Sequence, residues 1–378
     1  MAQSNTNIFA KTVDHFLAPI RAFLADSAVS EIMINNFDEI YVERNGQLVR
    51  TDARFEDADS LLAAIRNVLQ YTGKRLTMER PLMDARLPDG SRVHVVLPPL
   101  SRSGMCMTIR KFAKVMFSAE HLLELNSWTA EAMEYLKILV LAEKNLLVAG
   151  GTSSGKTCLL NVLSGFIPAH QRIVVIEDSA ELELQQDHVI SLESRPADRW
   201  GRGQVTIGDL FQSALRLRPD RIIIGEVRGG EALHMIQAMT SGHAGSMSTL
   251  HANAAADALN RLETMAMSGE VELPLHALRS QIASAIDVIV QTTRFNDGRR
   301  ALTQICEVLP LSRDGRYDVQ EMFTYQLAGG AEGKVGKGSL QWTGRRSSFA
   351  DEPKVRILRG SWQLTNKLFS EEGQAGRT

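Results

Sequence analysis

The sequence is poor in cysteine, nearly balanced in charge and free of long apolar runs. Its three cysteines, Cys106, Cys158 and Cys306, lie far apart in the chain and form no Cys-x-x-Cys pair. A structural zinc site is therefore not expected, and a reduced cytosolic setting suits these thiols. The formal net charge of −2 provides no general attraction to the nucleic-acid backbone, so nucleic acid is not an expected partner.

No stretch approaches the roughly 20 consecutive apolar residues that a membrane-spanning helix requires. The N-terminal residues mix charged side chains such as Lys11, Asp14 and Arg21 with apolar ones, unlike the hydrophobic region of a signal peptide. We therefore expect no direct membrane span, and membrane association only through a partner or a surface. With 44% hydrophobic residues over 378 positions, the chain can form two domains with a substantial core.

The first 111 residues predict a small α+β domain. Asn45-Gly46 stands between two segments of alternating polarity and predicts a β-hairpin turn. Apolar residues at helical spacing predict a helix over residues 60–71, which ends before Gly73. Alternating apolar and polar residues predict strands at 31–35, 39–44, 85–87, 92–97 and 105–110.

The following region predicts a larger α/β domain. Residues 145–149, 172–176 and 221–225 are short, almost continuous apolar runs, as buried parallel strands are. Helical patterns occur at 130–143, 156–165, 207–217, 231–241 and 254–267. This alternation predicts a doubly wound α/β fold. The expected organisation is a domain at 1–111, a linker at 112–117, a domain at 118–327 and a Gly-rich C-terminal tail at 328–378.

The strongest motif is Gly150-Gly151-Thr152-Ser153-Ser154-Gly155-Lys156-Thr157, which follows an apolar strand and begins a helix. It matches the P-loop pattern G-x-x-x-x-G-K-[ST] in full. The glycines allow backbone N–H groups to converge on phosphate oxygens, and the helix N-terminus adds positive potential. Lys156 is expected to reach the β- and γ-phosphates of ATP, and Thr157 to ligate Mg²⁺. The expected ATP-binding element runs from Gly150 to Cys158.

Acidic residues end two of the apolar strands. Glu226 follows the run Ile222-Ile223-Ile224-Gly225, so its carboxylate is expected beside the phosphates, where it holds Mg²⁺, partly through water, or polarises the attacking water. Glu177 ends the strand at 172–176, with Glu181 following it, and we expect Glu177 to aid Glu226 in activating or orienting the water. Acids on neighbouring parallel strands converge on one crevice, although an ordinary strand end or a solvated acidic loop is the simpler interpretation of each acid alone.

Two histidines flank a run of small residues, His243-Ala244-Gly245-Ser246-Met247-Ser248-Thr249-Leu250-His251. They are eight residues apart, which is not the i, i+4 spacing of two zinc ligands on a helix. We expect His243 and His251 to sense the γ-phosphate through hydrogen bonds of the neutral imidazole. A purely structural role for either ring stays open.

The order P-loop, acidic segment, Walker B strand and histidine segment resembles that of the type II/type IV secretion ATPase superfamily. The amino-acid sequences of these motifs are most similar to those of the tight-adherence (Flp, type IVb) pilus motor ATPases. The segments that carry this resemblance are Met83-Asp84-Ala85-Arg86-Leu87-Pro88-Asp89-Gly90-Ser91-Arg92-Val93, Thr108-Ile109-Arg110-Lys111-Phe112, Arg218-Pro219-Asp220-Arg221, Gly225-Glu226-Val227-Arg228-Gly229-Gly230-Glu231-Ala232 and Thr249-Leu250-His251-Ala252-Asn253.

The resemblance implies a RecA-like P-loop NTPase domain with a smaller α+β N-terminal domain. It implies a homohexameric ring in the bacterial cytoplasm, peripheral at the inner membrane, that works on inner-membrane pilus platform proteins. ATP would lie between the two lobes, and basic residues of the N-terminal lobe, with Arg92 and Arg110 as the best matches, would complete the site. Opening and closing of the lobes, driven by Mg-ATP, would power assembly or retraction of a type IVb pilus or a related secretion system.

The chain departs from the family pattern at a few positions. Ser153-Ser154 stands where the pilus branch usually has Gly-Ser, and Cys158 stands where threonine is usual. The tetracysteine motif of many type II secretion ATPases is absent. Two other functions remain open: a nucleic-acid translocase or conjugation-type secretion ATPase, which would need a basic groove with aromatic residues, and a nucleotide-gated scaffold with little turnover.

Overall fold

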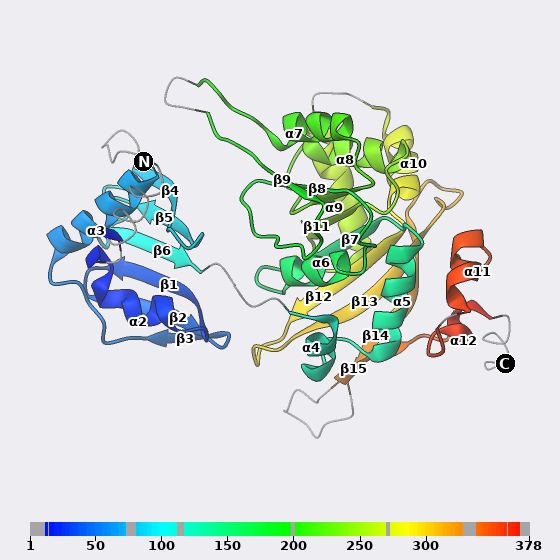
Figure 1. Ribbon diagram of the computed structural model, residues 1–378, viewed down its shortest axis with the longest axis horizontal. Coiled ribbons are helices and arrows are strands. Elements are labelled where there is room, and N and C mark those ends of the chain that lie inside the picture. The colour runs from blue at the N-terminus through cyan, green and yellow to red at the C-terminus, as the bar shows by residue number, and fades with distance from the viewer. Residues whose placement is uncertain are drawn as a thin grey trace. The chain divides into compact units, whose positions relative to one another are not determined.

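The computed structural model describes residues 12–13, 15–72, 81–111, 117–197, 201–269, 273–327, 338–360 and 362–370. The chain forms two compact units, Met1–Val115 and Met116–Thr378, and each is described by itself (Figure 1). Apart from Phe117, the linker predicted at 112–117 lies outside the described residues.

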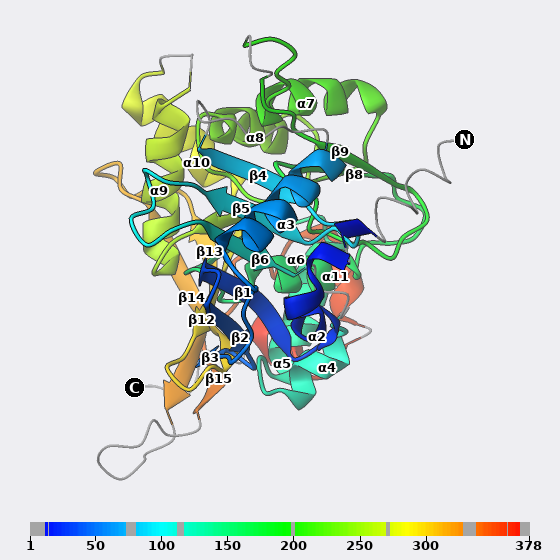
Figure 2. The same cartoon turned by 90° about the vertical axis from the view of Figure 1, so that its left-hand side faces the viewer.

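The N-terminal unit is an antiparallel six-stranded sheet with helices beside it. Its strand order is β3-β2-β1-β6-β5-β4, and α3 lies against the side that holds β4, β5 and β6 (Figure 2). The predicted hairpin turn is confirmed, because Asn45 and Gly46 both have positive φ, 50° and 79°. A capping box of Asp57 and Ser60 begins α3. The elements are η1 (Ala18–Ile20), α2 (Arg21–Ala25), β1 (Val29–Asn36), β2 (Glu39–Arg44), β3 (Gln47–Arg50), α3 (Ala58–Tyr71), β4 (Leu82–Arg86), β5 (Arg92–Val96) and β6 (Cys106–Arg110).

The larger unit contains a nine-stranded sheet in the order β15-β14-β13-β12-β7-β11-β10-β8-β9. The six strands from β12 to β9 pair in parallel, and β13, β14 and β15 continue the sheet antiparallel from β12. Its strands are β7 (Leu146–Gly150), β8 (Ile173–Glu177), β9 (Val189–Glu193), β10 (Arg221–Ile224), β11 (Met247–His251), β12 (Val288–Arg294), β13 (Arg300–Leu309), β14 (Asp318–Leu327) and β15 (Gly338–Trp342).

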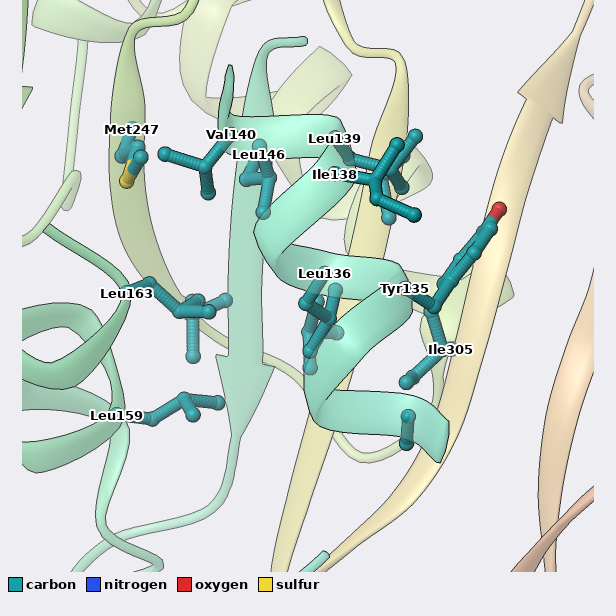
Figure 3. Packing of buried hydrophobic residues seen from close by; sticks show 14 of the residues in the cluster. Tyr135, Leu136, Ile138, Leu139, Val140, Leu146, Leu159, Leu163, Met247 and Ile305 are labelled. Atoms are coloured by element: carbon teal, nitrogen blue, oxygen red, sulfur yellow. The ribbon is translucent and has the colours of Figure 1, made fainter. Parts of the chain in front are cut away.

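Helices cover both faces of this sheet, as the apolar strands predict. All five residues of β7 are buried; Leu146 and Val148 point into one apolar cluster, and Leu147 and Ala149 into the other. Figure 3 shows the first layer, in which α5 packs over the strands. That face carries α4 (Ala119–Glu124), α5 (Ala130–Leu141) and α6 (Lys156–Ser164), and the other carries α7 (Ile207–Ala214), η2 (Leu215–Leu217), α8 (Glu231–Thr240), α9 (Ala255–Met267) and α10 (Leu275–Ala285). The predicted fold class, an α/β P-loop domain with a smaller α+β domain, is confirmed.

The C-terminal residues that the structure describes belong to the core of this unit. Besides β15 they form α11 (Pro353–Arg359) and α12 (Asn366–Phe369), which lie near α5 (Figure 1). The fully buried carboxylate of Glu307 accepts hydrogen bonds from Tyr135 Oη, from Ser347 Oγ at 2.5 Å and from Ser348 N at 2.7 Å. Leu368 and Phe369 are buried in the same cluster as α5. The segment therefore covers apolar surface that would otherwise face water.

None of the helices in the described ranges has the length and apolar composition needed to cross a lipid bilayer.

A close approach at Gly245 gives the first prediction. Gly245 has φ +77°, and a Cβ placed there would lie 1.3 Å from Nη1 of the fully buried Arg221. Arg221 itself is held by Gln171 Oε1 at 2.7 Å and by the carbonyl of Val140 at 2.9 Å. Gly245→Ala is therefore expected to lower the free energy of unfolding by roughly 3–5 kcal/mol in urea denaturation.

The matched control for this prediction is Gly242→Ala. Gly242 also has a positive φ, +101°, but a Cβ there would meet nothing within 4 Å. Backbone strain alone should then cost about 1–2 kcal/mol. Equal losses in the two variants would show that the overlap with Arg221 is not what limits this position.

Candidate nucleotide-binding site

The P-loop lies at the carboxyl end of β7, between β12 and β11. Gly155 caps α6 with φ +98°, a left-handed conformation that glycine adopts without strain. Gly150 is required by close approach, because a Cβ there would lie 2.4 Å from both Ser154 Oγ and Thr292 Oγ1. Those two hydroxyls are themselves 2.8 Å apart. The loop is thus built on tight contacts between β7 and β12, which leave its backbone N–H groups at the start of α6 for phosphate.

Lys156 is buried within the loop and points toward the acids. Its side chain is 8% exposed, and Nζ donates to the carbonyls of Gly150 and Gly151 at 3.3 and 3.1 Å. The same ammonium lies 3.4 Å from both ring nitrogens of His251 and 3.9 Å from Glu226 Oε1. A cation held beside the loop opening in this way can exchange its carbonyl partners for phosphate oxygens.

Glu226 also stands at the carboxyl ends of the strands, with a basic partner on each of its two oxygens. Oε1 accepts from His251 Nε2 at 3.0 Å, and Oε2 lies 2.6 and 2.5 Å from Nε and Nη2 of Arg228. The backbone after β10 is fixed by Thr249, whose Oγ1 donates to the carbonyl of Gly225 at 2.6 Å. The structure therefore brings Lys156, Glu226 and His251 together beside the P-loop.

The surroundings of His251 keep its ring neutral. Burial lowers the pKa of His251 below its usual 6.5, and the positive charge of Lys156 lowers it further, while the carboxylate of Glu226 opposes both effects. Since Nε2 faces a carboxylate, the proton of the neutral ring belongs on Nε2, and Nδ1 accepts. A neutral donor at this place can respond to phosphate oxygens without adding a charge of its own.

The other histidine, His243, lies at the opposite ends of the strands, on the amino side of β11. In the register of β11 with β7, His251 stands opposite Gly150 and Met247 opposite Leu146. His243 precedes Met247 at the amino end of β11, where Ser246 Oγ donates to the His243 carbonyl at 2.8 Å. Within one chain the length of β11 therefore separates His243 from the P-loop, beside which His251 stands.

The acidic segment after β8 contributes two carboxylates, Glu177 and Glu181, with different contacts. Glu177 is 4% exposed, and its Oε1 accepts from the backbone N–H groups of Glu181 and Leu182 at 2.8 and 3.1 Å. Glu177 thus holds the loop that follows it. The acid that reaches the P-loop is Glu181, whose Oε2 accepts from Thr157 Oγ1 at 3.1 Å.

This arrangement fits Mg²⁺ at the expected place. Magnesium prefers oxygen ligands, uses few protein side chains and keeps several waters. The hydroxyl of Thr157 and the carboxylate of Glu181 already lie together, and Glu226 lies 3.9 Å from Nζ of the preceding residue, Lys156. Thr157 would therefore ligate the ion, with Glu226 and Glu181 acting partly through water.

The expected arginines of the N-terminal unit lie side by side. Arg92 on β5 stands directly opposite Arg110 on β6, and Arg86 on β4 stands opposite Arg92. Glu31 is opposite Arg110 on the other side. Like charges in direct cross-strand register destabilise a sheet, and the carboxylate of Glu31 offsets part of the positive charge at Arg110. Sequence reasoning did not select Arg86, because only the strand register places it in the row.

The cysteine of the P-loop helix gives the second prediction. Burial raises the pKa of Cys158 to about 11, although the charge of Arg300 opposes the shift. At pH 8 only about a thousandth of this thiol is then thiolate, the reactive form. Iodoacetamide at pH 8 should leave Cys158 unmodified in the folded protein, as peptide mass mapping would detect. Rapid alkylation of Cys158 under these conditions would contradict the burial described here.

Comparison with known proteins agrees with this geometry. The family described as "Type II/IV secretion system protein" matches residues 14–334. The type IV secretion system protein PtlH of Bordetella pertussis is 36% identical over 309 residues, which cover 75% of this chain and 91% of PtlH. VirB11 of Bartonella quintana is 32% identical over 327 residues, covering 76% of this chain and 91% of VirB11.

Among solved structures, the ATPase DotB of Yersinia pseudotuberculosis has a similar fold, with a TM-score of 0.54 at 20% identity over 82% of this chain and 80% of DotB. The tight contacts at the P-loop, the acids at neighbouring strand ends and the extent of the sequence match all lead to one conclusion: this chain belongs to the type II/IV secretion system protein family.

Proposed function

We propose that this protein is a P-loop motor ATPase that powers assembly of a type IVb pilus or a related secretion system. The observation that carries the proposal is Glu226, which ends β10 beside the P-loop and lies 3.9 Å from Lys156 Nζ and 3.0 Å from His251 Nε2. A carboxylate so close to the phosphate-binding lysine can orient and deprotonate water beside a γ-phosphate. A scaffold that only binds nucleotide has no need for this acid.

In the proposed reaction, Lys156 and the backbone N–H groups of the P-loop bind the β- and γ-phosphates. Glu226 orients a water molecule and takes its proton as the oxygen attacks the γ-phosphorus, and the bond to the β–γ bridging oxygen breaks to release ADP and phosphate. His251 Nε2–H holds the Glu226 carboxylate in place. Glu177 positions the following loop. When bound at Thr157, Mg²⁺ would reduce the negative charge on the phosphates.

The row of arginines in the N-terminal unit suggests how hydrolysis becomes movement. We infer that Arg92 and Arg110 bind the γ-phosphate, so that the N-terminal lobe closes on ATP and opens after phosphate leaves. An arginine that neutralises charge in the transition state is worth several kcal/mol. In a homohexameric ring, successive closures would push on an inner-membrane platform protein from the cytoplasmic side.

The decisive experiment measures phosphate release by the purified protein with ATP, with and without Mg²⁺, while native mass spectrometry records the number of subunits. We expect hydrolysis that requires Mg²⁺ and a hexamer that ATP favours. Tight ATP binding without phosphate release would contradict the motor function and favour a nucleotide-gated scaffold. Strong stimulation by single-stranded DNA that disappears with added salt would instead favour a translocase.

A further inference from the structure

A second cation of the larger unit, Arg300, lies at the P-loop on the side away from Glu226. Arg300 is the first residue of β13, and its Nε donates to the carbonyl of Ser153 at 2.8 Å. Its Cδ would lie 3.6 Å from a Cβ placed on Gly155. The side chain therefore extends across the loop residues that precede Lys156.

The backbone of Arg300 is anchored from a third segment. Ser127 Oγ donates to the carbonyl of Arg300 at 2.9 Å, and Leu302 N donates to the carbonyl of Ser127 at 2.8 Å. A side chain that begins from a fixed strand end and is tied through Nε to the loop keeps its two terminal NH₂ groups near the loop opening. The P-loop is thus met by a pre-positioned guanidinium rather than a freely moving one.

The charge of Arg300 is not neutralised within the part of the chain that the structure describes. Ser153 O is the acceptor of its side chain there, and no carboxylate lies within 4.0 Å of it. In the register of β12 with β13 it stands directly opposite another arginine, Arg294.

The position of Arg300 along the sheet selects the part of the nucleotide it would meet. Lys156, which reaches the β- and γ-phosphates of a P-loop nucleotide, is turned toward His251 and Glu226 on β11 and after β10. Arg300 comes from β13, on the other side of β7. Its charge acts on Cys158 in the first turn of α6, and in a P-loop the backbone of this region holds the α- and β-phosphates.

We propose that Arg300 is a nucleotide-binding residue of the same chain, which contacts the α- and β-phosphates that ADP and ATP share. This inference rests on the proposed ATPase function and adds a residue that the motif does not contain. It also predicts that Arg300 contributes to the affinity for both ADP and ATP, whereas Glu226 and His251 act on the γ-phosphate of ATP alone.

The test is isothermal titration calorimetry with Mg-ADP and with a non-hydrolysable ATP analogue, on wild type, Arg300→Gln, Arg300→Lys and Arg299→Gln. Arg300→Gln should weaken both ligands roughly tenfold, since it removes a charged hydrogen-bond donor. Arg300→Lys, which keeps the charge, should stay within about threefold of wild type. Arg299→Gln is the matched control, because Arg299 Nε is paired with Asp297 at 2.6 Å. This variant should leave both affinities unchanged.

Several outcomes would overturn the inference. If Arg300→Gln leaves both affinities unchanged, Arg300 is a surface charge that does not contact the nucleotide. If only the affinity for the ATP analogue falls, Arg300 contacts the γ-phosphate instead. Arg300→Lys as weak as Arg300→Gln would mean that it acts only by bracing Ser153 through Nε. Failure of the wild-type protein to bind either nucleotide would instead refute the ATPase function on which the inference depends.

Discussion

Lys156→Ala is expected to abolish ATP hydrolysis while the protein remains folded. The Lys156 side chain is 8% exposed, and its ammonium donates to two loop carbonyls and lies within 3.9 Å of Glu226 and His251. Removing it takes away the only side-chain cation that the motif provides for the β- and γ-phosphates. Loss of a donor that stabilises developing charge typically lowers kcat by about 10²–10³-fold, and nucleotide affinity should fall with it. The measurement is phosphate release together with nucleotide titration.

The fold should survive this substitution because the apolar clusters do not depend on Lys156. Circular dichroism and the thermal midpoint test that directly. Lys354→Ala serves as a matched control, since Lys354 is an exposed lysine on α11 that pairs with Glu143 and should leave turnover unchanged. Full turnover by a folded Lys156→Ala protein would refute the proposal that the P-loop is the catalytic site.

Glu226→Gln is expected to separate binding from hydrolysis. The amide keeps the size of the side chain, and its one carbonyl oxygen can still accept from Arg228, but it cannot take a proton from water. General-base catalysis contributes about 10²–10⁴-fold, so kcat should fall by that amount. Affinity for ATP should be kept or improved, because a negative charge beside the γ-phosphate is gone. Single-turnover phosphate release and nucleotide titration measure the two effects separately.

Glu177→Gln provides the comparison for that variant. Glu177 accepts two backbone hydrogen bonds through a single oxygen, Oε1, and a glutamine carbonyl can occupy the same place. If Glu177 holds the loop rather than the water, this variant should lose much less activity than Glu226→Gln. A fall of equal size would place the general base at Glu177, and a Glu226→Gln protein with near wild-type kcat would remove Glu226 from that role.

Most of the α/β layer could be predicted because its signals are local. The predicted helices at 156–165, 231–241 and 254–267 correspond to α6, α8 and α9 within two residues at each end. The predicted helix at 207–217 is α7 followed by the tighter turn η2. In contrast, β11 was not predicted, since Ser248 and Thr249 are polar residues that are buried at 0% and 1% exposure in the middle of the sheet.

The sequence predicted the motifs of the candidate site but only some of the contacts between their side chains. The sequence pattern predicted Lys156 and Glu226 at the carboxyl ends of neighbouring strands, and in the structure Lys156 Nζ lies 3.9 Å from Glu226 Oε1. It did not separate His243 from His251, because eight residues along a chain do not reveal that a strand lies between two rings. It also did not reveal Thr292 or Arg300, which reach the P-loop from β12 and β13, more than 130 residues further along the chain.

By itself, the sequence predicted a phosphate-binding glycine-rich turn, showed that apolar strand segments precede its acids, and determined that it resembles secretion ATPases. These features depend on neighbouring residues, whose backbone preferences and apolar runs act over a few positions. Only the tertiary structure decided which side chains meet. The hydrogen bonds of Glu226 with His251, of Thr157 with Glu181 and of Arg300 with Ser153 join segments that the sheet brings together, and strand order and register are set by burial across the whole unit.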